Sequence, residues 1–364
     1  MMRNKCYWFV FLLLALASFW NNVSIHAAEA AIPQRWTRTR AWTWYHHQPW
    51  LIGCNYIPAT ADNTLEMWQG ATFDPRTINR ELGYAHKLGF NIIRVFLDAL
   101  VWEHNPAGYR ARLEQFLAIA HRHKIRVMFV FFDDCWNPTS HLGPQPEPIP
   151  GVHNSQWVQC PGPAELGDRA VWPKLKAYEQ GIMRAFAQDH RVILWDLYNE
   201  AGNSGNGLKT LPLLKAVFRW AMEIDPSQPI TSCVYGGPAK ISQFVLSHSD
   251  VITFHNYNGP KNLQREITQL KKLGRPMICT EYMRRPISTF AGSLPVFKRN
   301  NVGCLNWGLT NGRTQTIFPW GSKPGTPPPK VWFHNILHRD GRPFSIKEVH
   351  LIERFTGAAA WPVK

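Results

Sequence analysis

The sequence predicts an α/β protein, a (β/α)8 TIM barrel with a single domain, on three observations. Eight short apolar runs have the composition of buried strands, and segments of helical character separate them along the chain. The chain has 364 residues, a length that suits one large barrel once a leader is removed. Two of the apolar runs end on a glutamate, at Glu200 and Glu281, where parallel strands of a barrel would open onto a common site.

The N-terminus has the features of a secretory signal peptide, which we place at residues 1–28. Arg3 and Lys5 precede an apolar run over residues 7–20, and small residues follow it. The run is shorter than the roughly 20 residues of a membrane-spanning helix. We therefore expect a secreted or periplasmic protein with no membrane span, folded as one domain over residues 29–364.

Composition excludes several classes of function. The formal net charge is +15, but the basic residues are scattered, and an exported protein is a poor candidate for binding nucleic acid. His121 and His123 lie two apart on a predicted helix and point in different directions, and no paired-histidine motif occurs. We expect no metal, no other cofactor, and a monomer.

Seven cysteines are present, and Cys6 leaves with the leader. Cys135 and Cys160 flank one long loop, and in an oxidising compartment they are candidates for a disulfide. The remaining four lie inside apolar runs and are expected to be small core residues: Cys54, Cys233, Cys279 and Cys304.

The predicted strands are nearly continuous apolar runs, as expected where both faces of a parallel sheet are covered. They are residues 51–56, 91–97, 126–132, 192–198, 229–235, 251–255, 276–280 and 303–307.

The helices between the strands follow from start and stop signals. Asp74-Pro75 is an N-cap followed by a proline in the first turn, and Leu88-Gly89 and Leu273-Gly274 are typical helix ends. Helices are expected to begin near Asp74, Gly108, Glu165, Gly207, Pro238, Lys261 and Ala291, with a last one over residues 343–355.

Three segments fall outside this alternation. Residues 33–50 are rich in tryptophan without a helical period, and we expect a lead-in or short hairpin that closes the bottom of the barrel. Residues 133–163 and 309–330 are long loops that follow the third and eighth strands. In a barrel both would lie on the face that carries the functional site.

The residues at the strand ends suggest the chemistry. Besides the two glutamates they supply hydrogen-bonding groups and an aromatic wall: Asn55, Arg94, Asp133, Asp134, Asn199, His255, Tyr257 and Trp307. Two carboxylates with aromatic walls and no nucleophile–histidine arrangement favour cleavage of a glycosidic bond. One carboxyl protonates the leaving oxygen while the other attacks the sugar, and Arg94 beside Glu281 would keep that carboxylate ionised.

This set of residues resembles the clan A glycoside hydrolases, most closely the cellulase-like family 5. In that family an Asn-Glu pair on the fourth strand carries the acid/base and a glutamate on the seventh strand is the nucleophile. The resemblance implies that Glu200 is the acid/base and Glu281 the nucleophile of a retaining double displacement on a β-glycan. It also implies substrate-binding roles for Arg94, Asn199, His255, Tyr257 and Trp307, with Tyr257 bonded to the nucleophile.

The chain departs from the family pattern at two positions. Ala201 stands where a proline usually follows the Asn-Glu pair. The histidine of the third strand is missing, and the chain reads Asp133-Asp134-Cys135-Trp136 there. We include Asp134 and Trp136 among the substrate-binding candidates, although the two aspartates can equally cap the loop.

Other interpretations of single residues remain open. Glu200 can be a helix-cap or loop acid, and Glu281 an ion-pair partner of Arg284 or Arg285. Arg94 can be a structural salt bridge, and His255 can tie strands together by hydrogen bonds. Trp307 can be core, and Trp136, Trp157 and Trp320 can be loop packing. The rival functions are a carbohydrate-binding barrel without turnover, and a transglycosylase on the same site.

Overall fold

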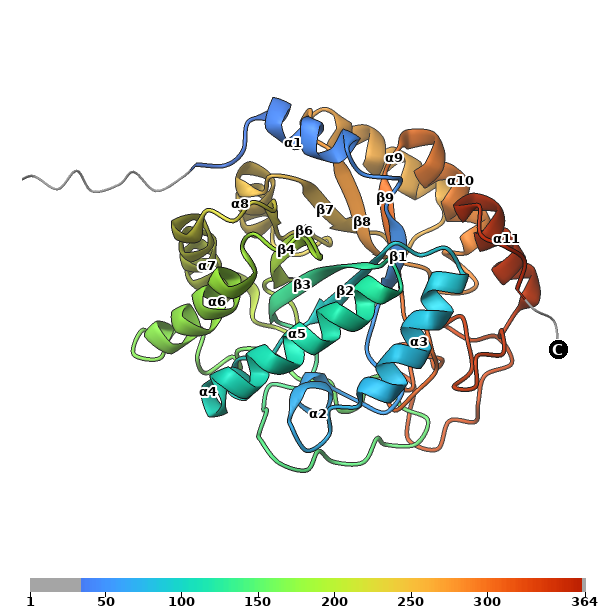
Figure 1. Cartoon of the computed structure of the whole chain (residues 1–364), viewed down its shortest axis with the longest axis horizontal. Coiled ribbons are helices and arrows are strands. Elements are labelled where there is room, and N and C mark those ends of the chain that lie inside the picture. The colour runs from blue at the N-terminus through green and yellow to red at the C-terminus, as the bar shows by residue number, and fades with distance from the viewer. Residues whose placement is uncertain (1–33, 362–364) are drawn as a thin grey trace, which may run out of the picture. The chain divides into compact units, whose positions relative to one another are not determined.

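The structure, a computed structural model, describes residues 34–361 of the chain. The predicted signal peptide lies outside the described residues. Nine parallel strands form one sheet in the order β5-β4-β3-β2-β1-β9-β8-β7-β6, with the helices outside it (Figure 1). The strands are β1 Ile52–Asn55, β2 Ile92–Phe96, β3 Arg126–Asp133, β4 Val192–Asn199, β5 Ile230–Thr231, β6 Cys233–Val234, β7 Ile252–His255, β8 Met277–Tyr282 and β9 Gly303–Trp307.

The fifth predicted strand is present as two short pieces, β5 and β6, on either side of Ser232. The first piece pairs with β4 and the second with β7. At the break, the Ser232 hydroxyl donates to the carbonyl of Tyr198 at 2.7 Å. The two pieces thus link β4 to β7 and nearly close the sheet into the predicted (β/α)8 barrel.

The helices begin close to their predicted starts, with one exception. Asp74 caps α3 by accepting from the backbone N–H of Thr77, and Pro75 occupies the first turn. The segment from Glu165 forms turns instead, and α6 begins at Trp172. The helices are α1 Arg38–His46, α2 Thr64–Trp68, α3 Pro75–Lys87, α4 Ala99–His104, α5 Pro106–Arg122, α6 Trp172–Phe186, the 3-10 helix η1 Gly207–Thr210, α7 Leu211–Ile224, α8 Ala239–His248, α9 Pro260–Lys271, α10 Phe290–Asn300 and α11 Ile346–Thr356.

The expected lead-in or hairpin at residues 33–50 is wrong, because this segment contains the helix α1. The Thr37 side chain caps it by accepting from the N–H of Arg40. Ala41 and Tyr45 are its buried residues, and their spacing of four places both on one face. Tyr45 packs on the apolar residues at the start of the strands, so α1 covers the end of the barrel where we expected a plug.

The barrel interior has an apolar layer at the N-terminal ends of its strands and a polar layer above it. The lower layer contains Leu51, Ile92, Met128, Leu194, Val251, Ile278 and Leu305. Above it the buried side chains of Arg94 and Asp196 form an ion pair at 2.8 Å, and Thr231 and Thr253 share a hydrogen bond at 2.9 Å. The polar layer therefore lies directly beneath the C-terminal ends of the strands.

Strand register brings the predicted site residues to one level of the barrel. Asn55 lies beside Arg94 on one side and Trp307 on the other. Asp133 pairs with Asn199 across β3 and β4, and His255 pairs with Glu281 across β7 and β8. Because parallel strands end at the same edge, these residues share the mouth of the barrel.

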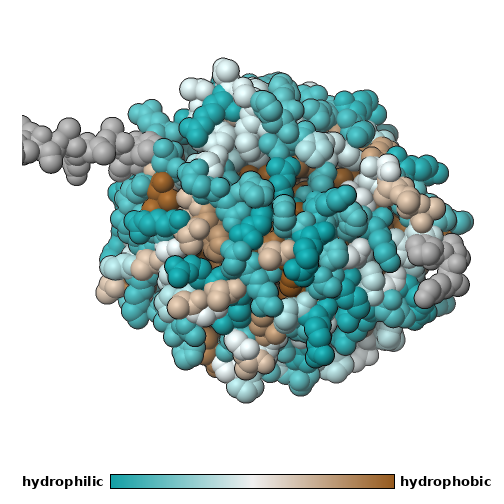
Figure 2. Space-filling view, in the orientation of Figure 1, coloured by the Kyte–Doolittle hydropathy of each residue, from teal (hydrophilic) through white to brown (hydrophobic). Residues whose placement is uncertain are grey.

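The face seen in Figure 2 is mainly hydrophilic, with hydrophobic residues in small separate areas. Within residues 34–361, no helix has both the length and the apolar composition needed to cross a membrane.

Candidate active site

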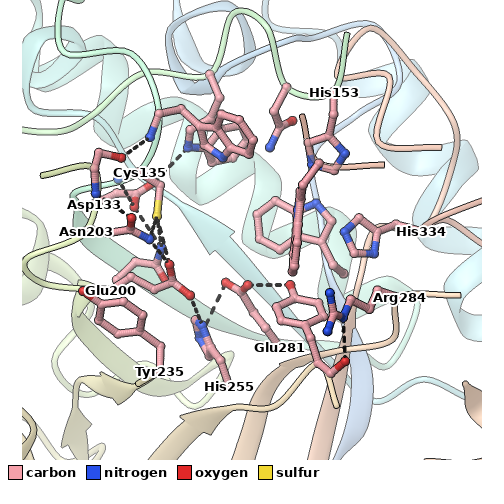
Figure 3. A pocket seen from close by; sticks show the side chains of 18 of the residues that line it. Asp133, Cys135, His153, Glu200, Asn203, Tyr235, His255, Glu281, Arg284 and His334 are labelled. Atoms are coloured by element: carbon pink, nitrogen blue, oxygen red, sulfur yellow. Dashed lines mark hydrogen bonds and ion pairs between the residues drawn. The ribbon is translucent and has the colours of Figure 1, made fainter. Parts of the chain in front are cut away.

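A pocket of about 490 Å³ opens at the C-terminal ends of the strands (Figure 3). Its walls come from strand ends and from the long loops that follow β3 and β9. Seven of the nine predicted site residues line it: Trp136, Asn199, Glu200, His255, Tyr257, Glu281 and Trp307. Arg94 and Asp134 do not.

Glu200 stands on a sharp turn immediately after β4. Its φ of 42° lies in the left-handed region, which is uncommon for a residue with a side chain, and the chain leaves the strand direction there. Its carboxylate accepts from the side-chain amide of Asn203 and, at 3.3 Å, from the thiol of Cys135. Burial raises the pKa of Glu200, while these two donors oppose the shift.

Two residues further along, Gly202 requires the freedom of glycine. Its φ is 90°, and a Cβ there would lie 2.8 Å from the carbonyl oxygen of Gly207. The backbone N–H of Gly202 donates to Asp134 at 2.6 Å, which fixes the loop behind Glu200.

Glu281 lies opposite Glu200 and is held at both of its oxygens. Oε1 accepts from Arg94 Nη1 at 2.8 Å, and Oε2 accepts from the hydroxyl of Tyr257 at 2.7 Å. The hydrogen bond from Tyr257 to this carboxylate is the one that the resemblance to family 5 implied. Burial raises the pKa of Glu281, and the charge of Arg94 and the hydrogen bond from Tyr257 oppose this shift.

His255 contacts both carboxylates. Its Nδ1 lies 2.6 Å from Glu200 Oε1, and its Nε2 lies 3.5 Å from Glu281 Oε1. Burial lowers the pKa of His255 to about 3, so the ring is neutral and carries one N–H. With Glu200 protonated, its O–H donates to Nδ1 and the ring N–H faces Glu281.

Arg94 lies beneath the pocket and is fully buried, so it does not line the wall as predicted. Its guanidinium donates upward to Glu281 and Asn199 and downward to Asp196, at distances between 2.6 and 2.9 Å. It also donates to Asn55 at 2.8 Å. Arg94 therefore positions the side chains that line the pocket, and its ion pair with Glu281 replaces the pairing of Glu281 with Arg284 or Arg285.

The two adjacent aspartates have different roles. Asp133 faces the barrel and lines the pocket, where it accepts from Asn199 and from the indole N–H of Trp157 at 2.8 Å each. Asp134 faces outward and is fully buried, and it accepts from Tyr198, Thr210 and the N–H of Gly202. Asp134 therefore lies behind the pocket wall and not in it as expected, because successive strand residues point to opposite faces.

The tryptophans divide into rim and packing residues. Trp136 and Trp320 are 38% and 41% exposed and line the pocket at its rim. Trp157 is 2% exposed and packs with Phe96 and Trp307, although its edge also reaches the pocket. Trp307 is therefore both a wall residue and part of this aromatic cluster.

Cys135 and Cys160 form no disulfide, which corrects the candidate pairing. The Cys160 thiol turns away from the pocket and accepts from the N–H of Ala99 at 3.3 Å. The Cys135 thiol instead faces Glu200 and Asn199 within the pocket. The four cysteines expected in the core are buried as predicted.

Several pocket residues were not found from the sequence. Most of them lie in loops without a strand or motif to place them, whereas Tyr235 stands at the end of the predicted fifth strand. They are Asn203, Ser204, Tyr235, His153, Asn154, Asn258, Arg284 and His334. Asn203 was the most accessible of these to sequence reasoning, since it follows Glu200 by three residues in a turn.

Three of the site residues meet the spacing of metal ligands. Glu200, His255 and Glu281 each place one ligand atom within 4.8 Å of the others. However, Oε1 of Glu281 already pairs with the Arg94 cation, and Glu200 Oε1 lies 2.6 Å from Nδ1 of His255. A cation placed among these atoms would be repelled by Arg94, so the donor set does not fit a metal.

Comparison with known proteins supports the barrel fold. Residues 167–299 match the family model of the TIM barrel domain of glycosyl hydrolases family 2. The matched stretch contains both Glu200 and Glu281. None of the curated proteins matches the sequence.

Solved structures with the same fold include glycoside hydrolases. The exo-β-1,4-mannosidase Op5Man5 from an Opitutaceae bacterium has 17% identity and a TM-score of 0.57, over 84% of this chain and 60% of that chain. GH5_18 from Streptomyces cattleya, in complex with Manβ1-4GlcNAc, has 12% identity and a TM-score of 0.55, over 85% and 80%. The endo-β-1,4-mannanase from Thermotoga petrophila has 16% identity and a TM-score of 0.54, over 84% and 76%.

At these identities the solved structures show a similarity of fold alone. The family model matches family 2, whereas the strand-end residues resemble family 5. The chain accordingly has the TIM-barrel fold of glycoside hydrolases, with its two glutamates at the barrel mouth.

Proposed function

We propose that the protein is an exported retaining glycoside hydrolase that cleaves β-linked glycosidic bonds by double displacement. Glu200 is the general acid/base and Glu281 the nucleophile. The catalytic domain spans residues 29–364 and acts as a monomer without a cofactor, after removal of a signal peptide at residues 1–28.

The observation that carries this proposal is the facing pair of glutamates. An oxygen of Glu200 lies within 4.8 Å of an oxygen of Glu281 across the pocket. Retaining enzymes hold their two carboxyl groups about 5 Å apart, whereas inverting enzymes need roughly 6.5–9.5 Å to admit a water. The separation supports direct attack by one carboxylate.

The environments of the two carboxyls support different roles. Glu281 contacts a guanidinium that stays charged, which favours the ionised form needed for attack on the anomeric carbon. Glu200 contacts only neutral groups: the thiol of Cys135, the amide of Asn203 and the ring of His255. Its burial favours the protonated form needed to protonate the leaving oxygen.

In the first step Glu281 attacks the anomeric carbon, and Glu200 gives its proton to the departing oxygen. A glycosyl ester on Glu281 results. In the second step Glu200, now a carboxylate, takes a proton from water as that water attacks the ester. His255 is neutral in the free site, and its Nδ1 accepts from the protonated Glu200, which orients this acid for the first step.

The remaining pocket residues bind the sugar. The Asn199 side chain is fixed between Arg94 and Asp133, which supports its proposed contact with the hydroxyl next to the anomeric carbon. Trp307 offers an apolar platform, and the exposed Trp136 can stack on a further sugar at the rim. Family 5 is the relationship that these residues favour.

The test is release of reducing sugar from a panel of β-glucan, mannan, xylan, galactan and pectic polysaccharides. Wild type is compared with Glu200→Gln and Glu281→Gln. The matched control is Glu179→Gln, because Glu179 is a fully buried glutamate of α6 that lies outside the pocket. We expect cleavage of at least one glycan, loss of most activity in both site variants, and no loss in the control.

Two other outcomes would support the two alternative functions. Binding of a glycan that is equal with and without the two glutamates, together with no cleavage, would establish the carbohydrate-binding barrel. Longer products formed from oligosaccharides in excess over hydrolysis would establish the transglycosylase.

A further inference from the structure

Two neighbouring arginines after β8 have very different surroundings. Arg285 is buried, and its guanidinium is fully used: it pairs with Glu348 at 2.6 Å and donates to three backbone carbonyls in the segment 332–335. The side chain of Arg284 makes one hydrogen bond, from Nε to the carbonyl of Tyr257 at 2.8 Å. Among residues 34–361, neither Nη1 nor Nη2 of Arg284 has a hydrogen bond or an ion pair.

The free end of Arg284 belongs to the pocket. The side chain is half-buried and lines the wall on the side of Glu281, across from Glu200 (Figure 3). Its Cζ lies 5.3 Å from the centre of the Trp320 ring. Tyr257 contacts both Glu281 and Arg284. Its hydroxyl donates to Glu281, and its backbone carbonyl accepts from Arg284.

Among the described residues that line the pocket, Arg284 is the one positively charged side chain. Its neighbour His334 and the nearby His153 each donate from Nδ1 to a backbone carbonyl, at 2.6 and 2.7 Å. Burial keeps both rings neutral, lowering the pKa of His153 to about 4 and that of His334 well below its usual value. The charge of Arg94 is matched below the pocket by Asp196 and Glu281.

The geometry of the guanidinium defines the ligand it fits. With Nε bound to Tyr257, Nη1 and Nη2 remain as a parallel pair of donors. Such a fork matches two oxygens of one anion, and the partly desolvated site strengthens the pairing. A neutral sugar hydroxyl would leave the charge without a partner.

We propose that Arg284 binds an anionic substituent, a carboxylate or a sulfate, on the sugar held next to Glu281. The substrate is then an acidic β-glycan. This inference rests on the glycosidase function proposed above and names the substrate class of the same site.

The test compares pairs of substrates that differ only in the acidic group. The pairs are 4-nitrophenyl β-glucuronide with β-glucoside, β-galacturonide with β-galactoside, and 6-sulfated with unsulfated forms of the neutral glycosides. Wild type is compared with Arg284→Met, which keeps much of the apolar stem. Arg110→Met is the control, since Arg110 is exposed on α5 and lies outside the pocket.

For at least one pair we expect wild type to prefer the acidic member. In Arg284→Met the ratio of kcat/KM, acidic over neutral, should fall about 10- to 100-fold. Arg110→Met should keep the wild-type ratio, which excludes an effect of net charge. Uronides and sulfates in separate arms distinguish the two anions. A ratio that is unchanged in Arg284→Met, or a wild type that prefers neutral members throughout, overturns the inference.

A binding measurement separates this inference from the proposed function. Wild type, Arg284→Met and Arg110→Met are run in native gels that contain polygalacturonate, alginate, carrageenan or neutral glucomannan. Retardation by an acidic gel that is lost only in Arg284→Met supports the inference even if no glycan is cleaved. Cleavage of neutral glycans that needs Glu200 and Glu281, without any effect of Arg284, supports the glycosidase and overturns the acidic substrate. No retardation and no cleavage overturns both.

Discussion

Arg94 Nη1 lies 2.8 Å from Glu281 Oε1, while Nη2 of the same guanidinium lies 2.8 Å from Oδ2 of Asp196, a carboxylate that is fully buried. One cation therefore joins the floor of the barrel to the pocket. It neutralises a charge that has no access to water and at the same time fixes the carboxylate that we assign as the nucleophile.

Replacement of Arg94 by methionine should destabilise the protein as well as inactivate it. Asp196 would remain buried without its partner, and breaking such a pair costs about 3–5 kcal/mol. Urea unfolding measures this loss. The double variant Arg94→Met, Asp196→Asn should recover part of the stability but none of the activity. A double variant that is no more stable than the single one would contradict the role of the unpaired charge.

The assignment of the two glutamates predicts different responses to azide. Glu200→Ala should lose roughly 10²–10⁴-fold in activity on poor leaving groups, because only those need the acid. On aryl glycosides with good leaving groups it should form the glycosyl ester and then accumulate it. Added azide should restore turnover and give a β-glycosyl azide.

Glu281→Ala should behave differently with the same reagent, because it cannot form the ester. Any azide product from this variant should have the α configuration, which NMR distinguishes. Identical products from the two variants would contradict the assignment.

The thiol of Cys135 should set the alkaline limb of the pH–rate profile. It donates to Oε2 of Glu200 at 3.3 Å, which stabilises the ionised form and lowers the pKa of that residue. Removing the donor in Cys135→Ala should raise the pKa of Glu200 and move the alkaline limb of kcat/KM to higher pH, by about half a unit or more.

Two variants control for this shift. Cys135→Ser keeps a donor and should stay near the wild-type profile. Cys160→Ala removes a thiol that faces Ala99 away from the pocket and should leave the alkaline limb in place. A shift in the acid limb instead would mean that Cys135 acts on Glu281.

Burial of His153 should make the protein less stable in acid. Its pKa is lowered to about 4 in the folded state from 6.5, so between these values the unfolded chain binds a proton there and the folded chain does not. The free energy of unfolding should therefore fall as the pH drops from 7.5 to 4.5, with roughly 2 kcal/mol of the loss due to this residue.

Urea unfolding at both pH values, in wild type and His153→Gln, measures this contribution as the difference between the two pH dependences. The exposed His141 of the same loop provides the control variant His141→Gln. Equal pH dependence in wild type and His153→Gln would contradict the prediction.

The strands and the position of the site were accessible from the sequence because they depend on local composition. Runs such as Val192–Asn199 are apolar throughout, and a carboxylate at the end of such a run marks where the chain leaves the barrel. The same apolar character hides which face a residue points to. Asp133 and Asp134 therefore looked equivalent, although one lines the pocket and the other holds the loop behind it.

The sequence by itself determined eight strands in order, two glutamates at their ends, and the neighbours Asn199, Tyr257 and Trp307. The sequence did not predict the helix α1. Its buried face becomes apparent only in the folded protein, where Tyr45 packs on the apolar residues at the starts of the strands. Only the tertiary structure decided that Arg94 lies under the pocket and that Cys135 faces Glu200. It also decided that the guanidinium of Arg284 keeps unused hydrogen-bond donors, whereas that of Arg285 is fully hydrogen-bonded. The physical reason is that strand composition is local, whereas a side chain's partners come from segments that meet only when the barrel closes.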